Sequence, residues 1–101
     1  MQELIDKVQE LVTFELARAN TIHPPKFNSM HEAYAVILEE VDEVREKLET
    51  IQWILHEVWF EVRCDRPKEE IDEYMVDMEK KAIHLAAEAI QVAAMCRKAR
   101  M

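Results

Sequence analysis

Apolar residues recur at helical spacing in three stretches of the chain, and no stretch alternates as a β-strand would. The longest stretch lies within 29–64, where the apolar residues follow one another in steps of four and three. They are Met30, Tyr34, Ile37, Val41, Val44, Leu48, Ile51, Leu55, Val58 and Val62. A stripe of this kind is typical of a helix that packs along its length on another helix. With similar stripes in 2–20 and 67–99, the sequence predicts an all-α fold of three helices.

The sequence also marks where these helices begin and end. The pair Pro24-Pro25 interrupts helical structure after the first stretch. Ser29, with Glu32 three residues later, forms the capping-box pattern of a helix start. We therefore expect a single domain over 1–101, with helices over about 2–20, 29–64 and 67–99.

Only a few residues connect the second helix to the third. Asp65 suits the N-cap of the third helix, and Pro67 suits its first turn. A connection this short predicts a long antiparallel helical hairpin, in which the numbers of facing residues sum to about 131. This register pairs Glu40 with Gln91, Glu43 with Glu88 and Lys47 with His84.

The two long helices carry more apolar surface than they can bury against each other. The first helix is too short to cover the remainder, and Trp53, Trp59 and Phe60 add apolar area away from the main stripe. Exposed apolar surface of this size usually marks an interface. We therefore expect a homo-oligomer, either a dimer or a tetramer, that completes a four-helix core.

The composition argues against binding to nucleic acid and against glycine-rich loops that bind phosphate. The net charge is −8, from 21 acidic and 13 basic residues, which disfavours binding to nucleic acid. The chain has no glycine, so loops that cradle phosphate through close backbone approach are excluded. Any phosphate must therefore be held by side chains or by a metal ion.

The sequence shows no membrane-spanning segment and no disulfide framework. No apolar run is long enough to cross a bilayer, and no leader resembles a signal peptide. We therefore expect no membrane partner and a cytoplasmic location. Cys64 and Cys96 lack metal-ligand spacing and are expected to be buried, reduced thiols.

Carboxylates gather at the edge of the predicted seam. Glu40 and Glu43 lie three residues apart on one helix face, and the register brings Glu88 and Gln91 opposite them. Oxygen ligands on two facing helices suit Mg²⁺ or Mn²⁺. The alternative is that these are ordinary acids of a solvated helix surface, which is where Glu39 and Asp42 are expected to lie.

Two basic side chains lie near these acids in the predicted register. Lys47 and His84 could orient a phosphate group, or could form surface pairs that contribute little to stability. The spacing alone leaves both alternatives open.

The stretch His31–Val44 resembles the metal-binding helix of the MazG-like all-α nucleoside triphosphate pyrophosphohydrolases. The pattern of that family is E-E-x-x-E on one helix and E-x-x-D on a later one. Glu39-Glu40-x-x-Glu43 matches the first part, and Glu88-Ala89-Ile90-Gln91 resembles the second. The run Val92-Ala93-Ala94-Met95 that follows is also typical of phage-type members. The resemblance covers roughly 27–98.

This resemblance implies Mg²⁺-dependent hydrolysis of a nucleoside triphosphate, a (d)NTP, to the monophosphate and pyrophosphate, with Mn²⁺ as a substitute metal. It implies that Glu40, Glu43 and Glu88 are metal ligands. For Glu39 it implies one of three roles: a group that supports the ligands without touching the metal, a further ligand, or the base that orients the attacking water. Gln91 stands where the family has aspartate, so it offers a neutral amide oxygen instead of a carboxylate. Members of the family work as dimers or tetramers.

A second hypothesis keeps the same helical scaffold without catalysis. With Gln91 in place of an anionic ligand, the chain would be a noncatalytic helical oligomer or a nucleotide-binding module with impaired metal binding. Stabilisation by Mg²⁺ or Mn²⁺ would count against this alternative.

Overall fold

The computed structural model describes residues 1–101, which form three α-helices and no strand. Helix α1 spans Gln2–Asn20, α2 spans Met30–Arg63 and α3 spans Lys68–Ala99. The prediction of an all-α fold is confirmed, and each helix begins and ends within about a residue of its expected bounds. None of the three helices is long and apolar enough to cross a membrane.

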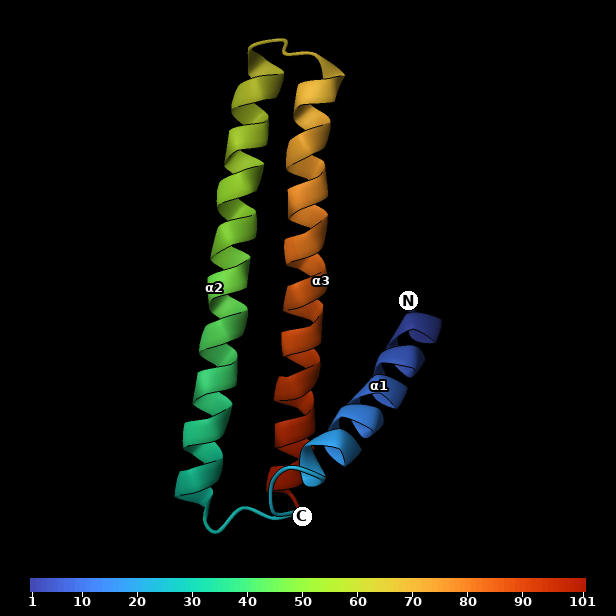
Figure 1. Ribbon diagram of the computed structural model, residues 1–101, viewed down its shortest axis with the longest axis vertical. Coiled ribbons are helices and arrows are strands. Elements are labelled where there is room, and N and C mark those ends of the chain that lie inside the picture. Colours follow the sequence, from blue (N-terminus) through green and yellow to red (C-terminus); the bar gives the residue numbers. More distant parts are fainter.

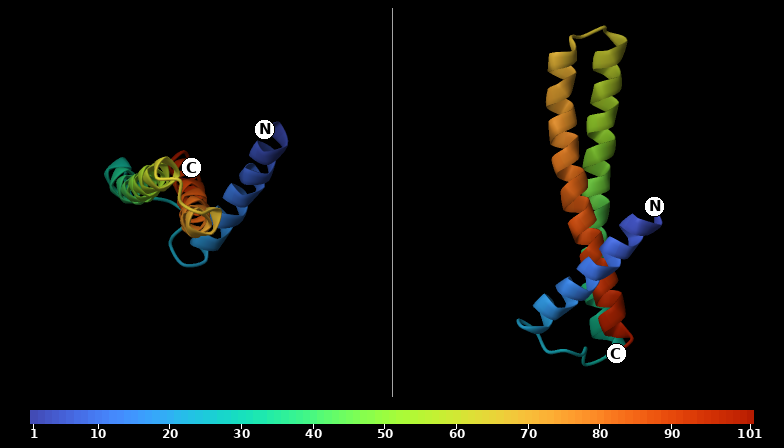
Figure 2. Two further views of the ribbon diagram at one scale, coloured as in Figure 1. Left: turned by 90° about the horizontal axis from the view of Figure 1, so that it is seen from above. Right: turned by 90° about the vertical axis from the view of Figure 1, so that its right-hand side faces the viewer.

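Helices α2 and α3 lie side by side and run in opposite directions, joined by a short turn (Figure 1). Helix α1 packs against α3 and makes no comparable contact with α2. Its C-terminal half lies on the C-terminal part of α3, while its N-terminal half projects away from the pair (Figure 2). The molecule is accordingly elongated, with extents of 55 × 29 × 23 Å.

Helix α2 begins at the expected capping residue. Ser29 is extended, with φ −161° and ψ 166°, and its Oγ accepts a hydrogen bond from the backbone N–H of Glu32 at 3.1 Å. The carboxylate of Glu32 accepts a hydrogen bond from Asn28 Nδ2 at 2.9 Å. The serine half of the predicted capping box is therefore present, and Asn28 is the partner of the glutamate side chain.

The turn between α2 and α3 differs from the prediction. Asp65 does not cap α3, because Pro67 occupies the N-cap and the helix begins at Lys68. Instead, Asp65 has φ 54° and follows the C-cap of α2. Its N–H donates to the Val62 carbonyl, and the Arg66 N–H donates to the Glu61 carbonyl, both at 3.1 Å. These two bonds form a Schellman motif, whose left-handed residue is usually glycine.

The core is small and lies mainly where α1 meets α3. Only nine of the 101 residues are buried. The largest cluster joins one face of α1 to the C-terminal part of α3 and consists of Val12, Leu16, Ala19, Ala94 and Met95. This contact fixes the angle of α1 and places its polar residues beside α2 and α3.

The apolar stripe of α2 is only half covered by α3. Ile37, Val44, Ile51 and Val58 are buried or half-buried, and on α3 the matching half-buried residues are Ile71, Met78, Leu85 and Val92. Apart from Met30 at the start of α2, which is also exposed, the other members of the two stripes stay exposed at intervals of seven residues. They are Tyr34, Val41, Leu48, Leu55 and Val62 on α2, with Met75, Ala82, Ala89 and Cys96 on α3. We call these nine residues the apolar face.

The exposed residues correct two expectations. The ten-residue stripe of α2 is not one seam, because a single neighbouring helix covers only one edge of it. Cys64 and Cys96 are both exposed free thiols, whereas the sequence analysis expected them to be buried. Cys64 is the C-cap of α2 and Cys96 lies on the apolar face, so neither enters the core.

The left-handed conformation of Asp65 predicts how the turn responds to substitution. Valine at this position would clash at positive φ, so Asp65→Val should lower the free energy of unfolding by about 1–2 kcal/mol. Asp65→Gly should be at least as stable as the wild type, because glycine has no Cβ to clash. Urea unfolding followed by circular dichroism measures both effects. Equal stability of the valine and glycine variants would contradict the assigned turn.

Candidate functional site

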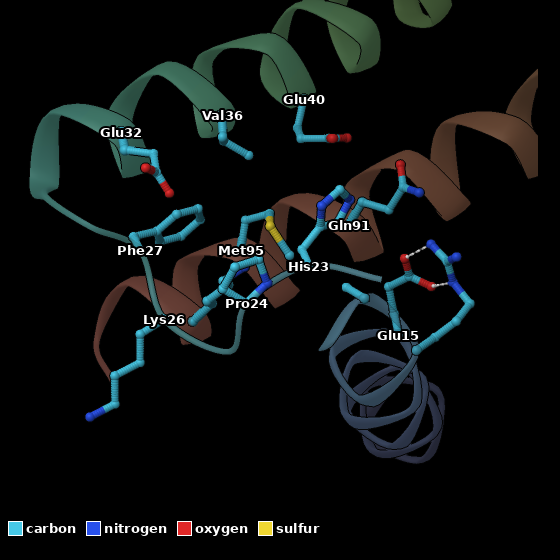
Figure 3. Close-up of a pocket in the computed structure, with 13 residues that line it drawn as sticks. Glu15, His23, Pro24, Lys26, Phe27, Glu32, Val36, Glu40, Gln91 and Met95 are labelled. Carbon is cyan, nitrogen blue, oxygen red and sulfur yellow. Dashed lines mark hydrogen bonds and ion pairs between the residues drawn. The ribbon is translucent and has the colours of Figure 1, made fainter. Parts of the chain in front are cut away.

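A cavity of about 240 Å³ lies where the three helices and the segment between α1 and α2 meet (Figure 3). Glu15, Arg18 and Ala19 of α1 line one wall. The facing walls come from α2 and α3, and the connecting segment adds the remainder. These residues are Glu32, Val36 and Glu40, then Gln91, Met95 and Lys98, and finally His23, Pro24, Lys26 and Phe27. The α1–α3 contact therefore creates the cavity.

The polar flank of the α2–α3 pair carries the acids singled out from the sequence. Glu40 directly precedes Val41 of the apolar face, and Glu88 likewise precedes Ala89. Successive residues of a helix are rotated by about 100° about its axis. The acids therefore lie along one edge of the buried α2–α3 contact, and the apolar face lies along the other edge. The sequence pattern thus separates a polar flank from an apolar face.

Two carboxylate oxygens on this flank are buried and lack a hydrogen-bond partner. They are Oε2 of Glu40 and Oε2 of Glu88, on facing helices. The pKa of Glu40 is raised from its ordinary value of 4.5, chiefly by burial and further by the negative charges of Glu43, Glu39, Glu88 and Glu15. Buried anionic oxygens without donors are costly, so this flank favours a positive charge.

Lys47 supplies one such charge. Its Nζ lies 3.6 Å from Oε1 of Glu88, and both side chains are mostly buried. The predicted register placed Lys47 opposite His84, one helical turn from the partner that the structure gives it. His84 itself is exposed.

The other predicted site residues are less enclosed. Gln91 lines the cavity together with Glu40, which agrees with the expected proximity of these two residues (Figure 3). Glu39 and Glu43 are exposed, although their charges act on Glu40. Asp42, expected to be solvated, is half-buried and forms an ion pair with Arg45 at 3.3 Å.

The acids of the polar flank do not converge on one point. No group of three or more histidine, cysteine, aspartate or glutamate side chains is arranged to hold one. The unsatisfied oxygens of Glu40 and Glu88 are nevertheless hard anionic donors of the kind that Mg²⁺ prefers. Because carboxylates repel one another, they lie close together only where a positive charge compensates them. At Glu88 the ammonium group of Lys47 provides this charge. Glu40 and Glu88 are therefore donors of the type that suits a divalent cation, without being gathered into a complete ligand set.

Sequence reasoning missed the contribution of α1 to the site. Arg18 donates two hydrogen bonds to the Glu15 carboxylate, at 2.6 and 2.9 Å. These bonds, together with the guanidinium charge, hold the pKa of Glu15 below its ordinary value, and a contact with Gln91 acts in the same direction. The apolar periodicity of α1 does not indicate that Glu15, and not another acid of this helix, contacts α3.

Sequence reasoning also missed a buried lysine near the end of α3. Lys98 is 6% exposed, and its Nζ lies 4.5 Å from the centre of the Phe27 ring. Lys98 follows Gln91 by seven residues, or two helical turns, and this spacing is a signal that places both on one face. The position of Phe27 has no comparable signal, because it lies in the connection between helices.

Comparison with known proteins gives no match, since no family model, no curated protein and no solved structure matches this chain. The function is therefore inferred from the residues of the site.

Neutralising Glu40 should stabilise the metal-free protein. The folded state binds this proton more tightly than the unfolded chain, so ionisation of Glu40 costs stability as the pH rises above 4.5. In chelator at pH 7, Glu40→Gln should raise the free energy of unfolding by about 1 kcal/mol, because it removes a buried, unpaired charge. The gain should shrink as the pH falls towards 4.5.

The exposed neighbour Glu39 provides the matched control. Glu39→Gln changes the net charge equally but should leave stability within about 0.5 kcal/mol of the wild type. Thermal unfolding over a pH series measures both variants. If Glu40→Gln were less stable than the wild type at pH 7, the Glu40 carboxylate would have a hydrogen-bond donor or a positive charge beside it, contrary to the structure.

Proposed function

We propose that this chain is a Mg²⁺-dependent nucleoside triphosphate pyrophosphohydrolase related to the MazG-like family. The observation that supports the proposal best is the pair of buried, unsatisfied carboxylate oxygens, Glu40 Oε2 and Glu88 Oε2, on facing helices. These are two of the acids that the sequence resemblance marks as metal ligands. A polar cavity of about 240 Å³, large enough for part of a nucleotide, lies beside Glu40.

Under this proposal Glu40, Glu43 and Glu88 would hold Mg²⁺, and the amide oxygen of Gln91 would add a neutral ligand. Mn²⁺ would serve as a substitute. When bound, the ion would neutralise the triphosphate charge and polarise the phosphoryl oxygens towards attack. The raised pKa of Glu40 reflects burial and neighbouring negative charges that nothing in the chain compensates, and a bound cation would lower this pKa by stabilising the carboxylate.

The remaining residues of the flank would bind substrate and move a proton. Water attacks the α-phosphorus, forming a new P–O bond while the bond from that phosphorus to the β-phosphate oxygen breaks. The products are the monophosphate and pyrophosphate, and the water proton passes to Glu39, a solvent-exposed carboxylate beside Glu40. Lys47 and His84 would contact phosphate oxygens, and for Lys47 this requires release from Glu88.

One observation favours the noncatalytic alternative. Lys47 already compensates Glu88, and the acids are not gathered into a group that could hold a metal ion. A scaffold that uses a lysine in this way can bind a nucleotide without cleaving it. Turnover and metal binding therefore decide between the two candidates.

Product analysis tests the enzymatic proposal. Purified protein with Mg²⁺ and a (d)NTP panel should release pyrophosphate and monophosphate, and Glu43→Gln or Glu88→Gln should lower the rate at least about a hundredfold. Glu49→Gln, an exposed acid of the same helix outside the site, is the matched control. Absence of turnover with Mg²⁺ and with Mn²⁺ would favour the noncatalytic module.

We further propose that the apolar face carries a second copy of the chain, giving a homodimer or tetramer with a four-helix core. Nine exposed apolar residues at seven-residue intervals line both helices, with further exposed aromatic area at Trp53 and Trp59. The spacing is that of a helical-bundle interface, and the buried core of one chain is small. A second α2–α3 pair would bury this face.

Charge placed on the apolar face should therefore dissociate the assembly. Wild-type protein should show at least twice the chain mass of 12.0 kDa in size exclusion with light scattering. The double variant Leu48→Lys, Leu55→Lys should approach the monomer mass and unfold at lower temperature, because buried unpaired charges are costly. Phe14→Lys changes an exposed apolar residue of α1, outside the apolar face, and should leave the mass unchanged. A monomeric wild type would refute this assembly.

A further inference from the structure

Lys98 is buried without an anionic partner. It is 6% exposed, and none of the ion pairs in the structure includes it. Its ammonium group lies 4.5 Å from the centre of the Phe27 ring. The ring and the negative end of the α3 dipole compensate part of this charge. The Nζ atom itself is not fully buried and reaches the cavity, where a positive charge without an ion-pair partner favours an anion.

The cavity that Lys98 lines has few other unpaired charges. Arg18 is held by Glu15, and the Glu32 carboxylate accepts its hydrogen bond from Asn28. Lys26 extends away from the cavity in Figure 3. Among the charged cavity residues that are not exposed, Glu40 and Lys98 are therefore the two without an ion pair or a hydrogen bond, and they have opposite charge and lie on different helices.

A ligand that satisfies both groups must be anionic yet able to approach a carboxylate. A polyphosphate accompanied by a divalent cation meets this requirement, because the cation contacts the carboxylate while free phosphate oxygens contact the ammonium group. A simple carboxylate ligand would satisfy Lys98 and repel Glu40. A neutral ligand would satisfy neither charge.

We propose that Lys98 is a phosphate-binding residue and that the cavity between α1, α2 and α3 receives the polyphosphate of the nucleotide. This inference rests on the proposed function for the identity of the ligand, and it adds a cationic residue that the sequence motifs do not include. Phe27 is a positioning residue, since its ring holds the Lys98 ammonium group at the cavity wall. Helix α1 is needed to complete this cavity, because Glu15, Arg18 and Ala19 close one side of it.

Binding of inorganic pyrophosphate tests the proposal without turnover. Isothermal titration calorimetry with Mg²⁺ should show binding to the wild type, weakened about tenfold or more in Lys98→Met. Methionine keeps the apolar stem against Phe27, and Lys98→Arg should retain most of the affinity because it keeps the charge. Lys80→Met, an exposed lysine of α3 outside the cavity, is the charge-matched control. Circular dichroism confirms that each variant is folded.

The outcomes separate this inference from the proposed function. Pyrophosphate binding that is lost in Lys98→Met and kept in Lys98→Arg and Lys80→Met supports the cavity, even if no nucleotide is hydrolysed. Equal affinity of folded Lys98→Met and wild type overturns the assignment, even if the enzyme is active. Equal loss in Lys80→Met also overturns it, because the effect would then be one of net charge alone.

Discussion

The structure depends on the limited width of a helix–helix contact. The apolar stripes of α2 and α3 are each two residues wide, and one neighbouring helix buries only one edge of each. The residues on one side of that contact are polar and the residues on the other side are apolar. Everything functional that we propose follows from this division, since the acids lie on one flank and the assembly surface on the other.

Helix α1 turns the polar flank into a site. Alone, the α2–α3 pair would present Glu40 and Gln91 on an open surface. The packing of Val12, Leu16 and Ala19 on Ala94 and Met95 brings a third wall beside them and carries the connecting segment across the opening. Enclosure reduces the solvation of Glu40, and this burial is the chief cause of its raised pKa. A small apolar contact thus changes the chemistry of a carboxylate on another helix.

The sequence predicts the features that depend on local periodicity. Three helices, their bounds and the Ser29 cap follow from spacing and from capping chemistry, and all agree with the structure. It could not predict which edge of the ten-residue stripe faces α3, because both edges are equally apolar. The left-handed Asp65 was missed because glycine is the usual signal of such a turn, and this chain has none.

The same limit applies to the candidate site. Glu40 and Gln91 were expected to lie together, since both follow from helix register, and they line one cavity. Phe27 and the α1 residues could not be assigned from the sequence, because the path of an irregular segment and the angle of a short helix are set by tertiary packing. The ion pair between Lys47 and Glu88 was not predicted, because a long flexible side chain can reach a residue one turn away from the one that the register places opposite it.

The separation of the polar flank from the apolar face has a consequence for how the protein would operate in the cell. In the proposed assembly through the apolar face, the cavities would lie on the opposite flank of each α2–α3 pair and would be lined by residues of one chain. Small molecules could therefore enter and leave without dissociation of the subunits. Any coupling between copies would then have to pass through a change in how the α2–α3 pairs pack, and not through a side chain shared between two cavities.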